Sequence, residues 1–266
     1  MDNSKKVKHS FPILKTIGGH EFIVDLITDS KTLDDVFALR YQIFNIELKE
    51  GLRASEKTHR DIDPYDQFCD HLAVIDRTKN QLIATYRLLP FEKAQANIGF
   101  YGETEFDLSE IHKKLPNSLE IGRSCVHQDY RNGSIISLLW YGIRAYMVSN
   151  DVNFTIGCTS LDKGSDALYA SKIYQLFKQL NANGDHIVSV KPLANKQVKG
   201  FDPDIQLSND EIIQLRRSLP SIFRGYMALD AKFSGHPAYD EEFDVIDFFC
   251  VFDYSAISKI AKRFSP

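Results

Sequence analysis

The segment 119–140, LEIGRSCVHQDYRNGSIISLLW, decides the fold. Residues 119–126 are mostly apolar and predict a strand, although the run also carries Glu120 and Arg123. A polar turn with Gly133 follows, and 135–149 then predicts a helix that is apolar on nearly every side. A strand that leads through a turn into a buried helix is typical of an α/β domain. Charges inside so apolar a strand need partners or a function, because an unpaired buried charge is costly.

Residues 131–134 predict an anion-binding turn. Gly133 permits a tight turn and close approach by another group, and Ser134 is a good helix N-cap. The free N–H groups and positive dipole end of a helix attract phosphate or pyrophosphate, and Arg131 would add a charge-assisted bond. A plain strand-to-helix connection is the alternative, and it is favoured on this segment alone because one glycine is a weak signal.

Glu120 and Arg123 lie three positions apart, which places them on opposite faces of a regular strand. Both can serve one pocket only if the strand bulges, and we place that bulge at Gly122. The alternative is a surface ion pair or two separately solvated charges.

The whole chain has 266 residues, 43% of them hydrophobic and 26% charged, with a net charge of −4. This composition predicts an ordinary globular protein, and no basic field suggests nucleic acid as a partner. Four scattered cysteines without a C-x-x-C pair argue against a zinc site or disulfide framework and fit a reducing cytosol. No apolar run is long enough for a signal peptide or a membrane span, so we expect a cytoplasmic protein.

Periodicity predicts alternating strands and helices with one early hairpin, hence an α/β fold with a mixed sheet. The predicted strands are 21–28, 71–76, 82–89, 119–126, 153–159, 186–191 and 243–252. The predicted helices are 32–49, 107–114, 135–149, 165–180, 210–217 and 255–264. We divide the chain into a lead-in over 1–20, a core over 21–191 and a C-terminal extension over 192–266 that completes the domain.

Several polar residues elsewhere could complete a pocket. Arg40 lies in an apolar helix, Arg87 interrupts the strand LIATYRLL, and four aspartates fall in RDIDPYDQFCDH. The aspartate spacing resembles a calcium loop, but Pro64 occupies its middle and the required Gly and Glu are missing, so we predict no metal ligands. Ser124 lacks the glycines of a nucleophile elbow, and we treat it as a strand residue.

Several blocks in fixed order resemble a known family. The chain resembles the GNAT-fold N-acyltransferases that make ornithine lipids and related aminolipids in bacteria. The blocks that carry the resemblance are RYQIFNIEL, DPYDQFCDHLAVID, ATYRLL, FYGETEFDL, the opening segment and LPSIFRGYMALDAKFSGHPAYDEEFDVIDFF. These enzymes are in turn similar to acyl-homoserine lactone synthases. The resemblance covers roughly 21–264.

The resemblance implies a GNAT-like, autoinducer-synthase-like mixed sheet, splayed at its centre and flanked by helices. It implies a 3-hydroxyacyl chain carried on acyl carrier protein as donor, and no other cofactor. The acceptor would be the α-amine of ornithine, with glycine as the alternative, and the product a lyso-aminolipid. Acyl carrier protein would be a partner, and an amphiphilic product makes peripheral contact with the inner membrane plausible.

The resemblance also implies site residues. Glu120 and Arg123 match the family's catalytic positions, and Arg40, Asp63, Asp66 and Arg87 match its substrate-binding positions. Residues Arg131, Asn132, Gly133 and Ser134 keep a shortened glycine loop, which suits phosphopantetheine on a carrier protein better than coenzyme A. Two alternatives stay open: a lactone-type signal synthase that uses S-adenosylmethionine, and a non-catalytic carrier-binding or lipid-binding module.

Overall fold

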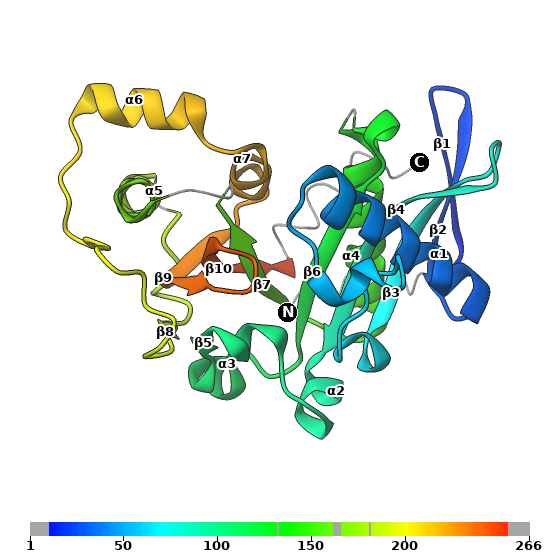
Figure 1. The fold of residues 1–266 in the computed structure, drawn as a ribbon, viewed down its shortest axis with the longest axis horizontal. Coiled ribbons are helices and arrows are strands. Elements are labelled where there is room, and N and C mark those ends of the chain that lie inside the picture. The colour runs from blue at the N-terminus through cyan, green and yellow to red at the C-terminus, as the bar shows by residue number, and fades with distance from the viewer. Residues whose placement is uncertain (1–10, 132, 162–165, 181, 255–266) are drawn as a thin grey trace, which may run out of the picture. The chain divides into compact units, whose positions relative to one another are not determined.

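The computed structural model describes residues 11–131, 133–161, 166–180 and 182–254 (Figure 1). They form two compact units, which we describe one at a time. The first contains the described residues of 1–98 and 117–153, and the second contains those of 99–116 and 154–256. The boundary predicted at residue 191 falls inside the second unit.

The first unit is built on an antiparallel sheet in which β1, β2, β3, β4 and β6 are neighbours in that order. These strands are β1 (Ile13–Ile17), β2 (His20–Ile27), β3 (Asp70–Asp76), β4 (Gln81–Pro90) and β6 (Ser118–Val126). β3 and β4 form the predicted hairpin. β1 lies in the segment assigned to the lead-in; its half-buried, half-exposed alternation is too weak a signal to separate a strand from an extended loop.

Helices α1 (Ser30–Tyr41) and α4 (Ser134–Ser149) both pack against this sheet (Figure 1). Eleven of the sixteen residues of α4 are buried, as its apolar sequence predicts. Gly142 lies so close to the sheet that a Cβ atom there would come within 2.8 Å of Val24 and Leu72. α1 continues into a π-helix, Gln42–Glu47, so the predicted helix 32–49 is confirmed in position but changes its winding. The unit also contains the short helices Arg53–Glu56, Asp66–Phe68, Phe91–Ala96 (α2) and Gln128–Tyr130.

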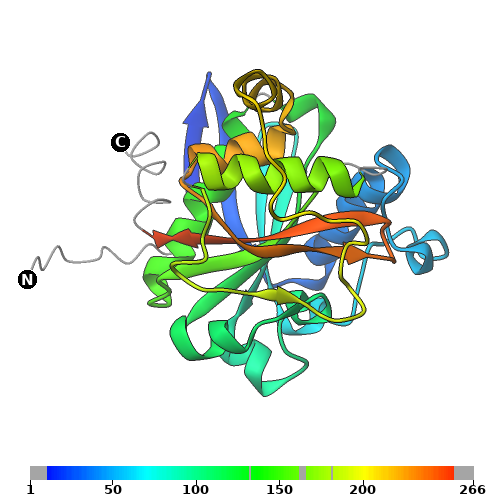
Figure 2. The ribbon, with the colours of Figure 1, turned by 90° about the vertical axis from the view of Figure 1, so that its left-hand side faces the viewer.

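The second unit has an antiparallel sheet in the order β7, β10, β9 and a two-stranded pair, β5 with β8. Its strands are β5 (Phe106–Asp107), β7 (Phe154–Ser160), β8 (Lys191–Pro192), β9 (Lys232–Asp240) and β10 (Val245–Asp253). Its helices are Tyr101–Thr104, α3 (Ser109–Lys114), α5 (Ala167–Gln179), α6 (Asn209–Ser218) and α7 (Ser221–Ala228). α5 runs along β9 and β10 in Figure 2. Four rings pack together in this unit: Phe177 stacks on Phe223 and Phe233, and Phe248 meets Phe177 edge-on.

Most elements lie within a few residues of their predicted positions, but the prediction of a strand over 186–191 was wrong. That segment forms a turn, in which the N–H groups of Ile187 and Val188 donate to Gly184, and only the two-residue β8 follows. Strand β9 was not predicted, because Gly235 and Pro237 weaken its pattern. The predicted helix 255–264 lies outside the described residues. None of the helices within the described ranges is long and apolar enough to cross a membrane.

The close contact of α4 with the sheet predicts the effect of filling it. Gly142→Leu should lower the free energy of unfolding by about 1–3 kcal/mol, because the new side chain meets Val24 and Leu72. Gly225→Ala in α7, where no described atom lies within 4 Å of the new Cβ, should instead stabilise by up to about 1 kcal/mol. Chemical denaturation of both variants checks this, and equal effects at the two glycines would contradict the close packing of α4.

Candidate active site

A buried network of arginines and aspartates lies between α1, the loop 50–69 and the sheet. Arg40, only 1% exposed, donates from Nε and Nη2 to Asp61, at 2.8 and 2.6 Å. Its Nη1 and Nη2 donate to the two carboxylate oxygens of Asp66, at 2.7 and 3.1 Å. One guanidinium therefore joins two points of the loop, in the planar geometry that arginine favours with carboxylates.

Arg87 of β4 makes a second junction in the same network. Its Nη1 donates to Asp63 at 2.5 Å and to Asp66 at 3.4 Å. The loop also bonds to itself, since the N–H of Asp63 donates to Asp66 and that of Tyr65 donates to Asp63. The loop between α1 and β3 is thereby held against one face of the sheet.

Strand β6 bulges where Arg123 lies. Thr85 pairs with Cys125 and Arg87 pairs with Gly122, so two residues of β6 face one residue of β4. The predicted bulge is therefore present, but it is formed by Arg123 and Ser124, one position after Gly122. Arg123 has φ 49°, a left-handed conformation that residues with side chains rarely adopt. Such strain persists only where the surroundings impose it, and it is frequent at functional sites.

The bulge brings Arg123 to the same face as Glu120. The register places Leu89 opposite Glu120 and Arg87 opposite Gly122, so Glu120 and Arg87 share a face. Arg123 extends into the same network, with Nε 3.8 Å from Asp61 and Nη2 3.6 Å from Asp63. Between them, a Cβ on Gly122 would meet no described atom within 4 Å. Glu120 is 6% exposed, so this face combines a buried carboxylate, a guanidinium and open space.

The charges of the network shift the pKa values of its members. Burial raises the pKa of Asp66, but Arg40 and Arg87 outweigh it and lower that pKa to about 2. Burial lowers the pKa of His71 on β3, whose Nε2 lies 3.3 Å from the carbonyl of Asp66. The arginines thus favour the carboxylate form of Asp66, and burial disfavours the protonated form of His71.

The nearby thiols are unsuited to covalent chemistry. Burial raises the pKa of Cys69 to about 12, and its Sγ donates to the carbonyl of Tyr65. Burial also raises the pKa of Cys125 to about 12. Since the thiolate is the nucleophilic form, neither cysteine is activated for attack on an acyl group.

The glycine turn differs in detail from its prediction. Gly133, with φ 85°, is the residue that caps α4, and Ser134 is the first residue of the helix instead of its cap. A left-handed cap suits glycine, and Gly133 has no side chain with which to cap the N–H groups of this end of α4. Arg131 is held by Glu47 of the π-helix and donates from Nε to the carbonyl of Val126. Asn132 lies outside the described residues.

The structure thus places Arg40, Asp63, Asp66, Arg87 and Arg123 in one network and Glu120 on the same sheet face. The sequence analysis did not select Asp61 or His71. Asp61 lay in the aspartate-rich segment already noted, whereas nothing in the sequence distinguishes His71 from an ordinary strand residue.

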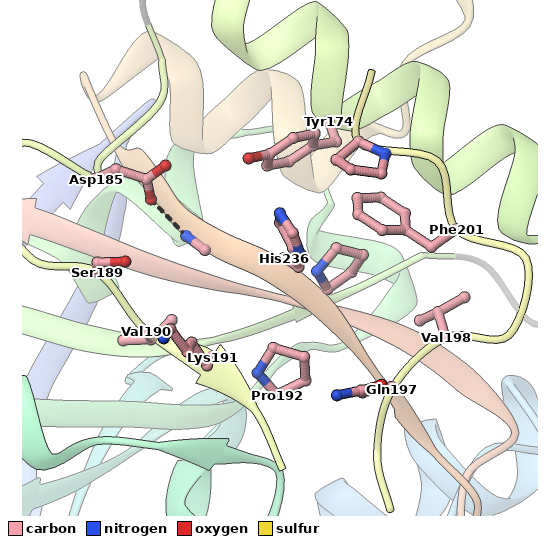
Figure 3. A pocket seen from close by; sticks show the side chains of 13 residues that line it. Tyr174, Asp185, Ser189, Val190, Lys191, Pro192, Gln197, Val198, Phe201 and His236 are labelled. Carbon is pink, nitrogen blue, oxygen red and sulfur yellow. Dashed lines mark hydrogen bonds between the residues drawn. The ribbon is translucent and has the colours of Figure 1, made fainter. Parts of the chain in front are cut away.

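The second unit contains a cavity of about 430 Å³ (Figure 3). Tyr174, Phe201 and His236 line one side, and Lys191 and Pro192 of β8 lie across from them. None of the residues predicted from sequence as site residues lines it.

Comparison with known proteins defines the class. Residues 39–141 match the model of the acetyltransferase (GNAT) domain. FeeM, an N-acyl amino acid synthase from uncultured soil microbes, has a similar fold, with a TM-score of 0.53 at 7% identity, covering 92% of this chain and 99% of FeeM. MesI, a CoA-dependent acyl-homoserine lactone synthase, gives a TM-score of 0.50 at 13% identity, covering 91% and 94%. The chain therefore has a GNAT-like fold, a mixed sheet flanked by helices.

Two relatives in sequence are more specific. An L-ornithine N(alpha)-acyltransferase of Agrobacterium fabrum is 32% identical over 245 residues, which cover 88% of this chain and 81% of that protein. The enzyme of the same name from Brucella abortus is 31% identical over 256 residues, covering 92% and 88%. The chain therefore belongs to the L-ornithine N(alpha)-acyltransferase family.

The network predicts that two aspartates, both paired with arginine, contribute very differently to the free energy of unfolding. Asp66→Asn should lower the free energy of unfolding by about 3–5 kcal/mol, because it leaves buried guanidiniums under-compensated. Asp34→Asn removes an exposed pair with Arg60 on the same helix and loop, and it should cost less than about 1 kcal/mol. Urea unfolding of the two variants checks this.

The same measurement tests the pKa of Asp66. Since its folded-state pKa, about 2, lies below an unfolded value of about 4, its contribution is complete above about pH 4 and disappears as the pH falls towards 2. The Asp66→Asn variant should lose less stability than the parent over this range. An equal loss in parent and variant would contradict the assignment.

Proposed function

We propose that this chain transfers a 3-hydroxyacyl group from acyl carrier protein to the α-amine of L-ornithine, giving an N-acyl-ornithine. The acceptor is supported by the names of its relatives, which match about nine-tenths of the chain. The donor is the expectation that the family resemblance implies, and the shortened glycine turn is compatible with it. No further cofactor is needed, because a thioester already carries an activated acyl group.

The single observation that carries the mechanism is the bulge of β6. It turns Arg123 to the face that holds Glu120, beside the open space at Gly122. A base and a cationic group on one face are what aminolysis of a thioester by an amino acid requires: one group takes the proton of the ammonium, and the other holds the carboxylate.

The proposed reaction is direct aminolysis of the thioester. Glu120, through a water molecule, accepts a proton from the α-ammonium, and the freed lone pair attacks the thioester carbonyl. A C–N bond forms, and backbone N–H groups released from the ladder at the bulge stabilise the oxyanion. Collapse breaks the C–S bond; the second proton of the former ammonium goes to the leaving pantetheine thiolate, and Glu120 returns the first proton to solvent. Arg123 binds the acceptor carboxylate.

Arg40, Asp63, Asp66 and Arg87 are given a supporting role in this proposal. Their charged atoms bind one another, so they hold the loop 50–69 and constrain Arg123. Direct contact of these four residues with substrate stays a prediction.

The donor side of the proposal uses the N-terminal end of α4. The N–H groups of this helix end, next to Gly133, suit the phosphate of phosphopantetheine. Arg131 contributes there only if it leaves Glu47. Carrier proteins are acidic, and exposed Lys191 and Lys199 of the second unit are candidates for contacting one.

Exposed apolar and basic side chains of α6 and α7 are candidates for contact with a membrane surface. Ile213 of α6 and Ile222 of α7 are 48% and 41% exposed, and Arg216 and Arg217 are exposed in the last turn of α6. Apolar and basic side chains on one helical segment favour an anionic membrane surface. The segment 256–264, which also has this character, lies outside the described residues.

Expression in a bacterium without aminolipids, followed by mass spectrometry of its lipids, tests the function. We expect a new N-(3-hydroxyacyl)-ornithine, whose mass identifies both acceptor and chain. An N-acyl-glycine would show that glycine is the acceptor. An acyl-homoserine lactone would show that the chain is a signal synthase. The absence of any product, with folded protein present, would favour a non-catalytic binding module.

Variants of the two site residues test the mechanism. Glu120→Gln should lower kcat by about 10²–10⁴-fold, because proton removal is lost. Arg123→Lys keeps the charge but loses the bidentate fork, so KM for ornithine should rise on the order of tenfold. Glu92→Gln on α2, an exposed carboxylate of the same unit, serves as the matched control and should retain activity. Folded Glu120→Gln protein with near-normal kcat would remove Glu120 from the mechanism.

A further inference from the structure

Three carboxylates that are distant in sequence meet inside the second unit. Glu105, Asp240 and Asp247 each offer an oxygen within 4.8 Å of the others. Their exposed fractions are 1%, 4% and 4%. Buried carboxylates are normally paired with cations or hydrogen-bond donors, so such a group requires an explanation.

The fold holds these carboxylates in fixed positions. Asp247 on β10 faces Ala238 of β9, so Asp240, two residues further along β9, lies diagonally across on the same face. Glu105 directly precedes β5, and its carbonyl accepts from the N–H of Leu193.

The segment 193–196 joins Glu105 to β9. The carbonyl of Leu193 accepts from the N–H of Lys196, and the carbonyl of Lys196 accepts from the N–H of Tyr239. The triad is therefore anchored by backbone bonds on all its elements, as a preformed site would be.

The oxygens of this triad are poorly satisfied. Among the described residues, no hydrogen-bond donor reaches either oxygen of Glu105, or Oδ1 of Asp247. Asp240 accepts from the N–H of Glu242 at 2.9 Å and, over a long 3.4 Å, from Tyr101 Oη. Three buried oxygens thus point into a cluster of like charge, in which Asp247 interacts with Ser160 and with the carboxyl group of Glu105. The arginine network shows the contrast, since each of its carboxylates faces a guanidinium.

We propose that Glu105, Asp240 and Asp247 bind a hard divalent cation, with Ca²⁺ the best match. Carboxylate oxygens alone, without His or Cys, select Ca²⁺, Mg²⁺ or Mn²⁺ over softer metals. Ca²⁺ binds oxygens at about 2.3–2.6 Å, so ligands around one ion lie up to about 5 Å apart, which accommodates this triad. The ion would complete its shell with water, and exposed Ser160, paired with Asp247 across β10, places the site next to solvent.

The charges also balance with a divalent ion. Three carboxylates carry −3, a divalent ion supplies +2, and the nearby Lys196 supplies +1. Without a cation, a proton is the competing occupant. Burial and the neighbouring carboxylates raise the pKa of Glu105 well above its ordinary value, and burial raises that of Asp247 to about 6. Metal and proton therefore compete for the same oxygens.

Metal binding and melting of the purified full chain test the site without any activity assay. Ca²⁺ added after chelator treatment should raise the melting temperature by roughly 5 °C at saturating concentration. Tb³⁺, which replaces Ca²⁺, should luminesce when tyrosine is excited, because Tyr101 lies beside Asp240. Ca²⁺ should quench that emission by competition.

Matched variants locate the response. Glu105→Gln and Asp247→Asn should each abolish the Ca²⁺-dependent shift, and Glu241→Gln, an exposed neighbour of Asp240, should keep it. Tyr101→Phe should lose most Tb³⁺ emission and keep the melting shift. If a triad variant does not fold, the titrations of the unaltered chain decide.

Three results would overturn the proposal. The first is that Ca²⁺ does not shift the melting temperature of the unaltered chain and Tb³⁺ does not luminesce. The second is that both triad variants keep the Ca²⁺-dependent shift. The third is that mild acid stabilises the chain and Ca²⁺ does not. The last would identify a shared proton as the occupant.

Discussion

The first unit depends on the contact of Arg40 with Asp61 and Asp66. A guanidinium that is 1% exposed is tolerable only because four hydrogen bonds to two carboxylates replace its water. That contact holds the loop 50–69 to α1, and the same loop brings Asp63 to Arg87. Removing one charge leaves others buried without compensation, so α1, the loop and β4 are coupled through this one set of contacts.

The strained conformation of Arg123 follows from this arrangement. In a regular strand its side chain would point away from Glu120. The bulge turns it towards Asp61 and Asp63, whose negative charges attract it. The buried aspartates thus favour the left-handed backbone conformation of Arg123. In that conformation its guanidinium lies on the strand face that also carries the carboxylate of Glu120. Gly122, with no side chain, leaves room between them.

The two units treat buried carboxylates in different ways. In the first, three aspartates meet three arginines, and the pKa of Asp66 is lowered. In the second, three carboxylates meet one another, with Lys196 nearby, and the pKa values of Glu105 and Asp247 are raised. The first arrangement has one guanidinium for each carboxylate, whereas the second has three carboxylates and only the ammonium group of Lys196 nearby.

The sequence by itself determined the order of most strands and helices, the apolar helix after Gly133 and the residue types of the site. Local periodicity and turn chemistry carry that information. It also indicated that β6 must bulge if Glu120 and Arg123 act together.

Only the tertiary structure decided which charges meet. Asp61 and His71 lie in the site although the sequence did not single them out. Gly133 and not Ser134 caps α4, and the segment predicted as a strand over 186–191 forms a turn. Glu105 and Asp240 are 135 residues apart, a separation over which no local pattern can pair two carboxylates. Side-chain contacts depend on strand register, and register is set by long-range pairing and by strain at single residues such as Arg123, neither of which a short stretch of sequence specifies.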